Sequence, residues 1–173
     1  LKERHATFME LRSDKRPGEF KSKPNRAGTT VFVAPDLVVG TLAKGFEMYR
    51  GLEAPFHRAV FMMFLISEVH PFFDGNGRAA RIMMNAEFVA QDEQRIIIPT
   101  VYRDDYLTAL KALSQSEKLT PVIRVLDFAQ RYTGSIHWEH FDTARSDLQH
   151  TNAFRDSTEA EDHGVRLVLP KNI

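Results

Sequence analysis

The sequence predicts a mostly α-helical protein with one small β element, and three observations support this fold class. The segment Ala54–Val69 is strongly apolar, and its length and its content of Met, Phe, Leu and Ala favour a buried helix over the alternative, a buried strand. Several further segments have a helical composition and are separated by Gly, Pro and polar residues. Near the N-terminus, only the β-branched and aromatic run Thr29–Val33 gives a convincing strand signal.

The expected elements follow one another without an internal repeat, a low-complexity tract or a linker, so we expect one domain over residues 1–173. Lys15–Gly28 is rich in Lys, Pro, Gly and Asn, which predicts an exposed loop. Gln94–Thr100 and Arg166–Leu169 are expected to be short β-like segments. Helices are expected at Leu1–Leu11, Asp36–Tyr49, Ala54–Val69, Arg78–Ala90, Tyr102–Ser114, Pro121–Tyr132 and Trp138–Ala153.

Composition excludes several classes of protein. Lys plus Arg and Asp plus Glu each total 23, and this balance argues against a dedicated nucleic-acid binder. The chain has no cysteine, which rules out disulfides and thiolate metal sites and suits the reducing cytoplasm where we expect the protein to work. The longest wholly apolar run, Ala59–Ile66, is too short to cross a membrane, and no signal peptide is visible. Because Leu1 already lies in a helical pattern, we expect an N-terminal piece to precede it.

The segment from His70 to Arg81 combines the parts that phosphoryl-type transfer needs. The turn Gly75-Asn76-Gly77 lies between two helical patterns, and its backbone N–H groups at the start of a helix can bind phosphate oxygens. Arg78 and Arg81 are three residues apart and suit a polyphosphate. Asp74 supplies a carboxylate that can hold Mg²⁺ beside phosphates. The neutral imidazole of His70 can accept the proton of a hydroxyl group.

Two plainer explanations compete with this one. Gly75, Gly77 and Ala80 match a dinucleotide-binding fingerprint, but that fingerprint needs a preceding strand, and here a helical pattern and Pro71 precede it. A tight Gly-Asn-Gly turn with solvated charges would explain each residue alone but explains their joint spacing poorly. The chain has no Walker-type phosphate-binding loop.

The run His70-Pro71-Phe72-Phe73-Asp74-Gly75-Asn76-Gly77-Arg78-Ala79-Ala80-Arg81 resembles the complete motif of the Fic family, His-x-Phe-x-Asp/Glu-Gly-Asn-Gly-Arg-x-x-Arg, at every fixed position. Weaker similarity covers about residues 18–132, which would form the core of a single Fic domain, with a C-terminal helix and tail at 134–173. The resemblance implies a helical bundle in which the motif loop joins two central helices. It also implies a β-hairpin flap over the active site, in the stretch Arg26–Pro35.

The resemblance further implies a protein adenylyltransferase that moves AMP from ATP to a Tyr, Thr or Ser hydroxyl of a target protein, with Mg²⁺ present and pyrophosphate released. His70 would be the base, Asp74 would hold the metal, and Phe72 would anchor the loop. Tyr106 aligns with a residue that contacts adenine in relatives, although a packing role is an equal alternative. The phosphates would be bound by Gly75, Asn76, Gly77, Arg78 and Arg81, and a target segment would pair with the flap residues Thr29, Thr30, Val31, Phe32 and Val33.

Two alternatives to this function stay open. The chain could be a catalytically silent Fic-fold regulator that binds nucleotide or a partner, although the intact His70 argues against it. It could also transfer another group, such as UMP or phosphate. Many Fic proteins carry an inhibitory Ser/Thr-x-x-x-Glu-Gly/Asn helix, which this chain lacks in complete form; Ser157-x-x-x-Glu161 is the nearest candidate. We therefore expect an inhibitor in a preceding N-terminal segment or on a separate protein, and a homo-oligomer stays open.

Overall fold

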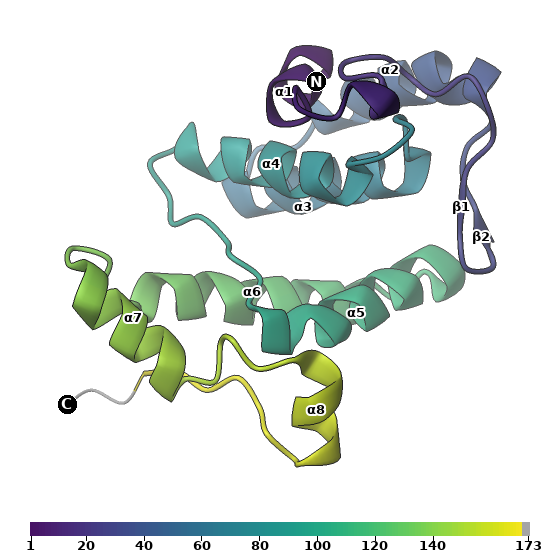
Figure 1. Cartoon of the computed structure of the whole chain (residues 1–173). Helices are drawn as coiled ribbons and strands as arrows, with labels where there is room; N and C mark the ends of the chain where they lie inside the picture. The colour runs from purple at the N-terminus through teal and green to yellow at the C-terminus, as the bar shows by residue number, and fades with distance from the viewer. Residues whose placement is uncertain (171–173) are drawn as a thin grey trace. The chain divides into compact units, whose positions relative to one another are not determined.

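The structure is a computed structural model that describes residues 1–170, and it is mostly helical with one two-stranded antiparallel sheet (Figure 1). The predicted fold class is therefore confirmed. The chain forms two compact units, residues 1–93 and the residues from Gln94 onward, which are described separately below. Within residues 1–170, no helix combines the length and the apolar character that a bilayer span requires.

The first unit is built on a pair of packed central helices. It contains α1 (Lys2–Phe8), β1 (Arg26–Ala27), β2 (Thr30–Val31), α2 (Val38–Tyr49), α3 (Pro55–Val69) and α4 (Asn76–Val89). The helices α3 and α4 make the most extensive contact, and α2 packs against α3. Buried residues recur on α3 at Ala59, Met63 and Ile66 and on α4 at Ala80, Met84 and Phe88, so each helix turns one apolar stripe inward.

A polar cluster joins the three longer helices of this unit. Arg58 on α3 forms an ion pair with Glu87 on α4 at 3.1 Å, and the hydroxyl of Tyr49 on α2 donates to the same carboxylate at 2.6 Å. The guanidinium of Arg58 also bonds to the Tyr49 hydroxyl and, at 3.2 Å, to the carbonyl of Leu52. The cluster fixes the loop between α2 and α3, so it supports the helices that carry the motif.

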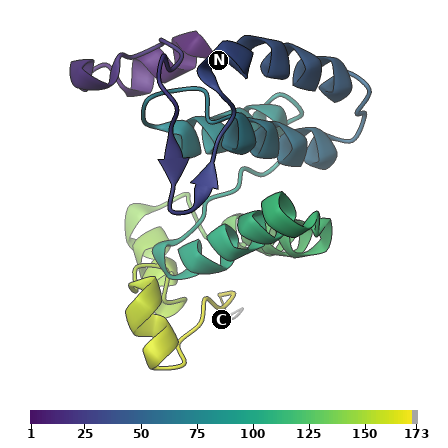
Figure 2. The same ribbon diagram turned by 90° about the vertical axis from the view of Figure 1, so that its right-hand side faces the viewer.

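The hairpin β1–β2 is shorter than the predicted strand Thr29–Val33. Arg26 pairs with Val31 and Ala27 pairs with Thr30, while Gly28 and Thr29 form the turn (Figure 2). Gly28 has a φ of 57°, a conformation that glycine adopts without steric cost. The prediction of an exposed loop over Lys15–Gly28 is wrong in part, because Lys21 within it is buried.

The second unit contains α5 (Arg103–Ser116), α6 (Leu119–Ser135), α7 (Phe141–His150) and α8 (Ser157–Asp162). The helices α5 and α6 form its main packed pair. Pro121 lies in the first turn of α6, as predicted. The short helix α8 was missed; the side chain of Asp156 caps it by accepting from the N–H groups of Thr158 and Glu159.

Three sequence predictions for this unit are wrong. Gln94–Thr100 is not a strand, because the N–H of Ile97 donates to the hydroxyl of Thr133 instead of to a neighbouring strand. Arg166–Leu169 is not a strand either. The helix predicted over Trp138–Ala153 begins only at Phe141, since the indole N–H of Trp138 donates to the carbonyl of Thr133 at the end of α6.

Candidate active site

The motif loop joins the two central helices of the first unit, as the sequence predicted. The helix α3 ends at Val69, and α4 begins at Asn76. The side-chain amide of Asn76 closes the loop, because its Oδ1 accepts from the N–H of Phe72 at 2.8 Å and its Nδ2 donates to the carbonyl of Phe72 at 2.9 Å. Asn76 is 3% exposed, so its side chain fixes the loop while its backbone N–H belongs to the free first turn of α4.

His70 directly follows α3 and has a left-handed backbone with a φ of 49°. Its Nδ1 lies 3.1 Å from the carbonyl of Ser67, and because a carbonyl only accepts, Nδ1 carries the proton. The other nitrogen, Nε2, is then the basic one. Burial lowers the pKa of His70, which the hydrogen bond to Ser67 opposes, and the positive charge of Lys21 lowers it further. The ring is therefore neutral near pH 7, as a general base requires.

A helix end that suits anions follows His70 in the chain. The N–H groups of Asn76, Gly77 and Arg78 form the first turn of α4, where a helix carries partial positive charge. Arg81 lies one turn further along the same helix and is half-buried. The guanidinium of Arg78 lies 5.3 Å from the ring centre of Phe8 on α1, and its Nη1 is 3.5 Å from the carbonyl of Phe8. The loop thus presents both the helix end and two cations.

Asp74 is exposed at the start of this turn, and its Oδ1 accepts from the N–H of Gly75 at 2.7 Å. Among residues 1–170 there is no cluster of three or more His, Asp or Glu side chains arranged to hold a metal ion. A single carboxylate beside a phosphate-binding helix end fits Mg²⁺, which keeps several waters and takes its other ligands from substrate phosphates. The residues present therefore fit the metal predicted from the sequence.

The sequence analysis missed one residue that shapes the site, His5 on α1. This histidine is fully buried and stacked on Phe72, with ring centres 3.6 Å apart. Its Nδ1 accepts from the N–H of Gly18 at 2.9 Å, so its Nε2 carries the proton and donates to the carbonyl of Asp74 at 3.0 Å. Nothing in the local sequence marks His5, because its partners are distant in the chain.

Gly75 is the position where the loop requires a glycine. Its φ of 74° is left-handed, and an added Cβ would lie 3.0 Å from the sulfur of Met9 and 3.1 Å from the ring of Phe8. The helix α1 and the residues after it therefore pack closely against the motif loop. The motif depends on a part of the chain that lies far before it in sequence.

The hairpin contributes one aromatic side chain that contacts His70. The ring of Phe32 stacks on the imidazole of His70, with centres 3.7 Å apart. The other predicted flap residues differ in exposure: Val31 and Thr29 are exposed, while Thr30 and Val33 are half-buried. The structure thus brings Phe32 to the site and leaves Val31 on the outside of the hairpin.

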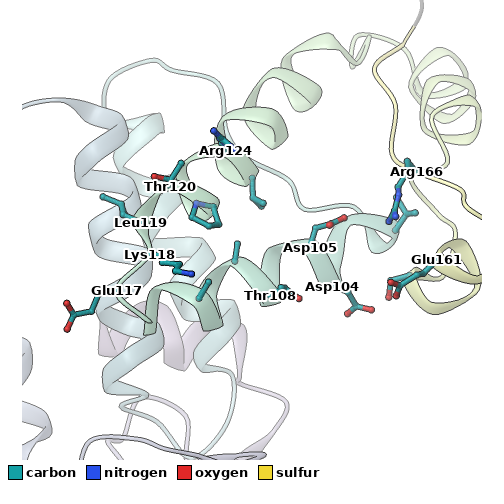
Figure 3. Close-up of a pocket in the computed structure, with 16 residues that line it drawn as sticks. Asp104, Asp105, Thr108, Glu117, Lys118, Leu119, Thr120, Arg124, Glu161 and Arg166 are labelled. Carbon is teal, nitrogen blue, oxygen red and sulfur yellow. The ribbon is translucent and has the colours of Figure 1, made fainter. Parts of the chain in front are cut away.

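Tyr106 belongs to the second unit and lies on α5. It is 3% exposed, which is what the packing alternative predicts, and its predicted contact with adenine stays a prediction. The same unit contains a cavity of about 1090 Å³ between α5, the start of α6 and α8 (Figure 3). Glu161, the nearest candidate for an inhibitory glutamate, lines this cavity together with Asp104 and Arg166.

Comparison with known proteins decides the family. Residues 1–87, which contain the hairpin and the whole motif loop, match the model of the Fic/DOC family. The chain belongs to the Fic/DOC family. The Fic motif is thus set in the fold that the resemblance implied, with the motif loop between α3 and α4.

Curated Fic relatives carry the name of an enzyme. The chain is 28% identical over 160 residues to a protein named protein adenylyltransferase Fic from Drosophila virilis, covering 88% of this chain and 31% of that protein. It is 27% identical over 128 residues to protein adenylyltransferase fic-1 from Caenorhabditis briggsae, covering 69% of this chain and 25% of that protein. The chain therefore spans about a third or less of the length of these relatives.

Solved structures share the Fic fold. A Fic-domain-containing signalling protein from Bacteroides thetaiotaomicron aligns with a TM-score of 0.61 at 21% identity, covering 76% of this chain and 57% of that one. Fic-1 from C. elegans aligns with a TM-score of 0.62 at 24% identity, covering 76% and 41%. BepC from Bartonella tribocorum, solved with bound AMPPNP, aligns with a TM-score of 0.55 at 16% identity, covering 65% and 64%.

Proposed function

We propose that this chain is a protein adenylyltransferase that moves AMP from ATP to a Tyr, Thr or Ser hydroxyl of another protein. The observation that carries the proposal is the state of His70, whose Nδ1–H is bound by the carbonyl of Ser67 at 3.1 Å. This bond leaves Nε2 as the proton acceptor, a few residues before the anion-binding start of α4. The names of the curated relatives support the same activity.

The triphosphate of ATP is bound by the motif loop in this proposal. The first N–H groups of α4 bind phosphate oxygens, and Arg78 and Arg81 neutralise the outer phosphates. Asp74 would hold Mg²⁺, which would offset the negative charge of the phosphates when bound. Support for a nucleoside triphosphate comes from the AMPPNP bound to the BepC protein, which shares the fold.

The transfer itself follows from these positions. The hydroxyl oxygen of the target attacks the α-phosphorus of ATP, and the bond from that phosphorus to the bridging oxygen of the β-phosphate breaks. Pyrophosphate leaves, and the hydroxyl proton passes to Nε2 of His70. The N–H groups of α4 and the two arginines stabilise the charge that gathers on the phosphate oxygens. The exposed edge of the hairpin pairs with an extended segment of the target and presents its hydroxyl.

Intact-mass spectrometry tests this function. The purified chain is incubated with ATP and Mg²⁺, alone and with a cell extract, and then with UTP in place of ATP. The proposal predicts that AMP is added to the chain itself or to extract proteins, and that the reaction depends on ATP. Addition of phosphate or UMP would support another transfer chemistry, and ATP binding without any covalent product would support the silent regulator.

A further inference from the structure

Lys21 is a buried cation in a segment that is otherwise largely exposed. It is 3% exposed, and among residues 1–170 no carboxylate forms an ion pair with it. Its Nζ donates instead to the carbonyl of Val69 at 3.1 Å and to Oδ1 of Asn25 at 2.6 Å. Val69 is the last residue of α3, where a helix carries partial negative charge. Burying an ammonium group without a counter-charge is costly, which points to a function for its placement.

Asn25 connects Lys21 to the backbone around His70 through its side-chain hydrogen bonds. Its Oδ1 accepts from Lys21, so its amide Nδ2 faces the opposite way. That Nδ2 donates to the carbonyl of His70 at 3.1 Å and to the carbonyl of Phe72 at 3.0 Å. The two bonds hold His70 in its left-handed conformation, which residues other than glycine rarely adopt.

The same two residues connect the loop to the hairpin. The backbone N–H of Lys21 donates to the carbonyl of Pro71 at 2.8 Å, and the carbonyl of Asn25 accepts from the N–H of Phe32 at 3.3 Å. Phe32 in turn stacks on the imidazole of His70. Lys21 and Asn25 therefore fix both the backbone of the base and the aromatic ring that covers one of its faces.

We propose that Lys21 is a positioning residue for the base: acting through Asn25, it holds the backbone and ring of His70 in the orientation that accepts the hydroxyl proton. This inference rests on the proposed function, because the orientation of the proton acceptor matters only if AMP is transferred to a target hydroxyl that must lose its proton. It concerns a segment outside the motif, in which the sequence predicted only an exposed loop.

The charge of Lys21 gives this role a signature that packing alone would not have. The pKa of His70 is lowered chiefly by burial, and among charged groups Lys21 lowers it while Asp74 raises it. Removing the ammonium group should therefore raise the pKa of His70, in addition to loosening the loop.

The experiment compares three variants with the wild-type chain. Lys21→Met removes the charge and both side-chain hydrogen bonds while keeping a long apolar stem. Asn25→Leu removes the two amide bonds to the loop but leaves the charge of Lys21. Lys23→Met is the matched control, since Lys23 is an exposed lysine of the same segment. For each variant we measure kcat and KM for ATP in self-modification, the pH profile of kcat/KM, thermal unfolding, and the pKa of His70 by NMR titration.

We expect Lys21→Met to lower kcat by about 10–100-fold through misplacement of the base, with KM for ATP changed by less than about 3-fold. The acid limb of its pH profile and the NMR pKa of His70 should both move upward. Asn25→Leu should lower kcat without that upward shift, and Lys23→Met should match wild type. If Lys21→Met does not fold, the kcat of Asn25→Leu carries the test.

If the wild-type chain is active, two results would overturn the inference. One is wild-type kcat in both Lys21→Met and Asn25→Leu. The other is a loss of kcat in Lys21→Met that follows a fall in melting temperature and leaves the pKa of His70 unchanged, since this would make Lys21 a purely structural residue. If the wild-type chain transfers nothing, the proposed function fails. The stacking of Phe32 on His70, followed by NMR, then decides the positioning role alone: its loss in both Lys21→Met and Asn25→Leu supports the role, and its retention in both overturns it.

Discussion

The ring of Phe32 lies flat against the imidazole of His70, with ring centres 3.7 Å apart and planes inclined by only 4°. This contact joins the hairpin to the motif loop at the residue that we propose as the base. The adjacent residue Val31 is 73% exposed, so the hairpin has one side that faces the base and one side that is open. Substitutions on the open side can therefore be tested separately from substitutions at the contact with His70.

The open edge of the hairpin should govern target binding. The carbonyl of Asn25 accepts from the N–H of Phe32, and because hydrogen-bonded and non-hydrogen-bonded pairs alternate in antiparallel strands, the N–H of Val31 points outward. Val31→Pro removes this donor, and we expect it to lower kcat/KM for a protein target by about 2–10-fold, the value of one hydrogen bond. ATP affinity, measured by calorimetry, should stay unchanged. Val31→Ala keeps the N–H and is the control; an equal loss in both variants would argue against strand pairing.

Asp74 should account for the metal dependence. Asp74→Asn keeps the size of the side chain and its acceptor for the N–H of Gly75, but it removes the negative charge. We expect activity to fall by about 10²-fold or more, and the remaining activity to respond weakly to Mg²⁺, because in the proposed site the Asp74 carboxylate would be the charged group that holds the metal. The measurement is a Mg²⁺ titration of AMP transfer. An unchanged titration curve would assign the metal to another residue.

Gly75 should matter for stability because α1 packs against it. Gly75→Ala places a methyl group 3.0 Å from Met9 and 3.1 Å from Phe8 at a left-handed φ, whereas Gly28→Ala meets nothing within 4 Å at a similar φ. We expect Gly28→Ala to lower the free energy of unfolding by about 1 kcal/mol. Gly75→Ala should lower it by about 1–3 kcal/mol more, from crowding. Denaturant unfolding checks this, and equal losses would show that α1 does not hold the loop.

Short-range patterns explain what was predictable about this protein. The apolar run of α3 and the Gly-Asn-Gly turn before α4 are local signals, and the structure has both elements where they were expected. The chemistry of the motif is equally local, since base, carboxylate, helix end and cations lie within twelve consecutive positions.

Long-range contacts explain what was not predictable. His5 donates to the carbonyl of Asp74, 69 residues away, and Lys21 donates to the carbonyl of Val69, 48 residues away. No periodicity or motif therefore marks either residue as part of the site. The apparent strand at Ile96-Ile97-Ile98 failed for a similar reason, because the N–H of Ile97 finds its acceptor on Thr133 in α6 rather than on a neighbouring strand. In each case a tertiary hydrogen bond overrode what the local composition indicated.

The pKa of His70 predicts the pH dependence of transfer. The pKa of His70 is lowered from its ordinary value of 6.5, chiefly by burial, so more than half of the imidazole is still neutral when the pH reaches the midpoint of an ordinary histidine. We expect kcat/KM to fall at low pH with an acid limb centred below 6.5. Because the folded state favours the neutral form, the contribution of His70 to stability is also full above 6.5 and is lost as the pH falls further. An acid limb centred above 6.5 would contradict this environment for the base.

The most direct test of the central claim is AMP transfer from ATP labelled at the α-phosphate, measured for the wild-type chain and for His70→Ala. His57→Ala is the control, since His57 is an exposed histidine on the same helix that leads to the motif. We expect label on protein with the wild type and with His57→Ala. We expect a rate about 10²–10⁴-fold lower with His70→Ala, and unchanged ATP binding in all three. Transfer by His70→Ala at a rate near that of the wild type would contradict the role of His70 as the base.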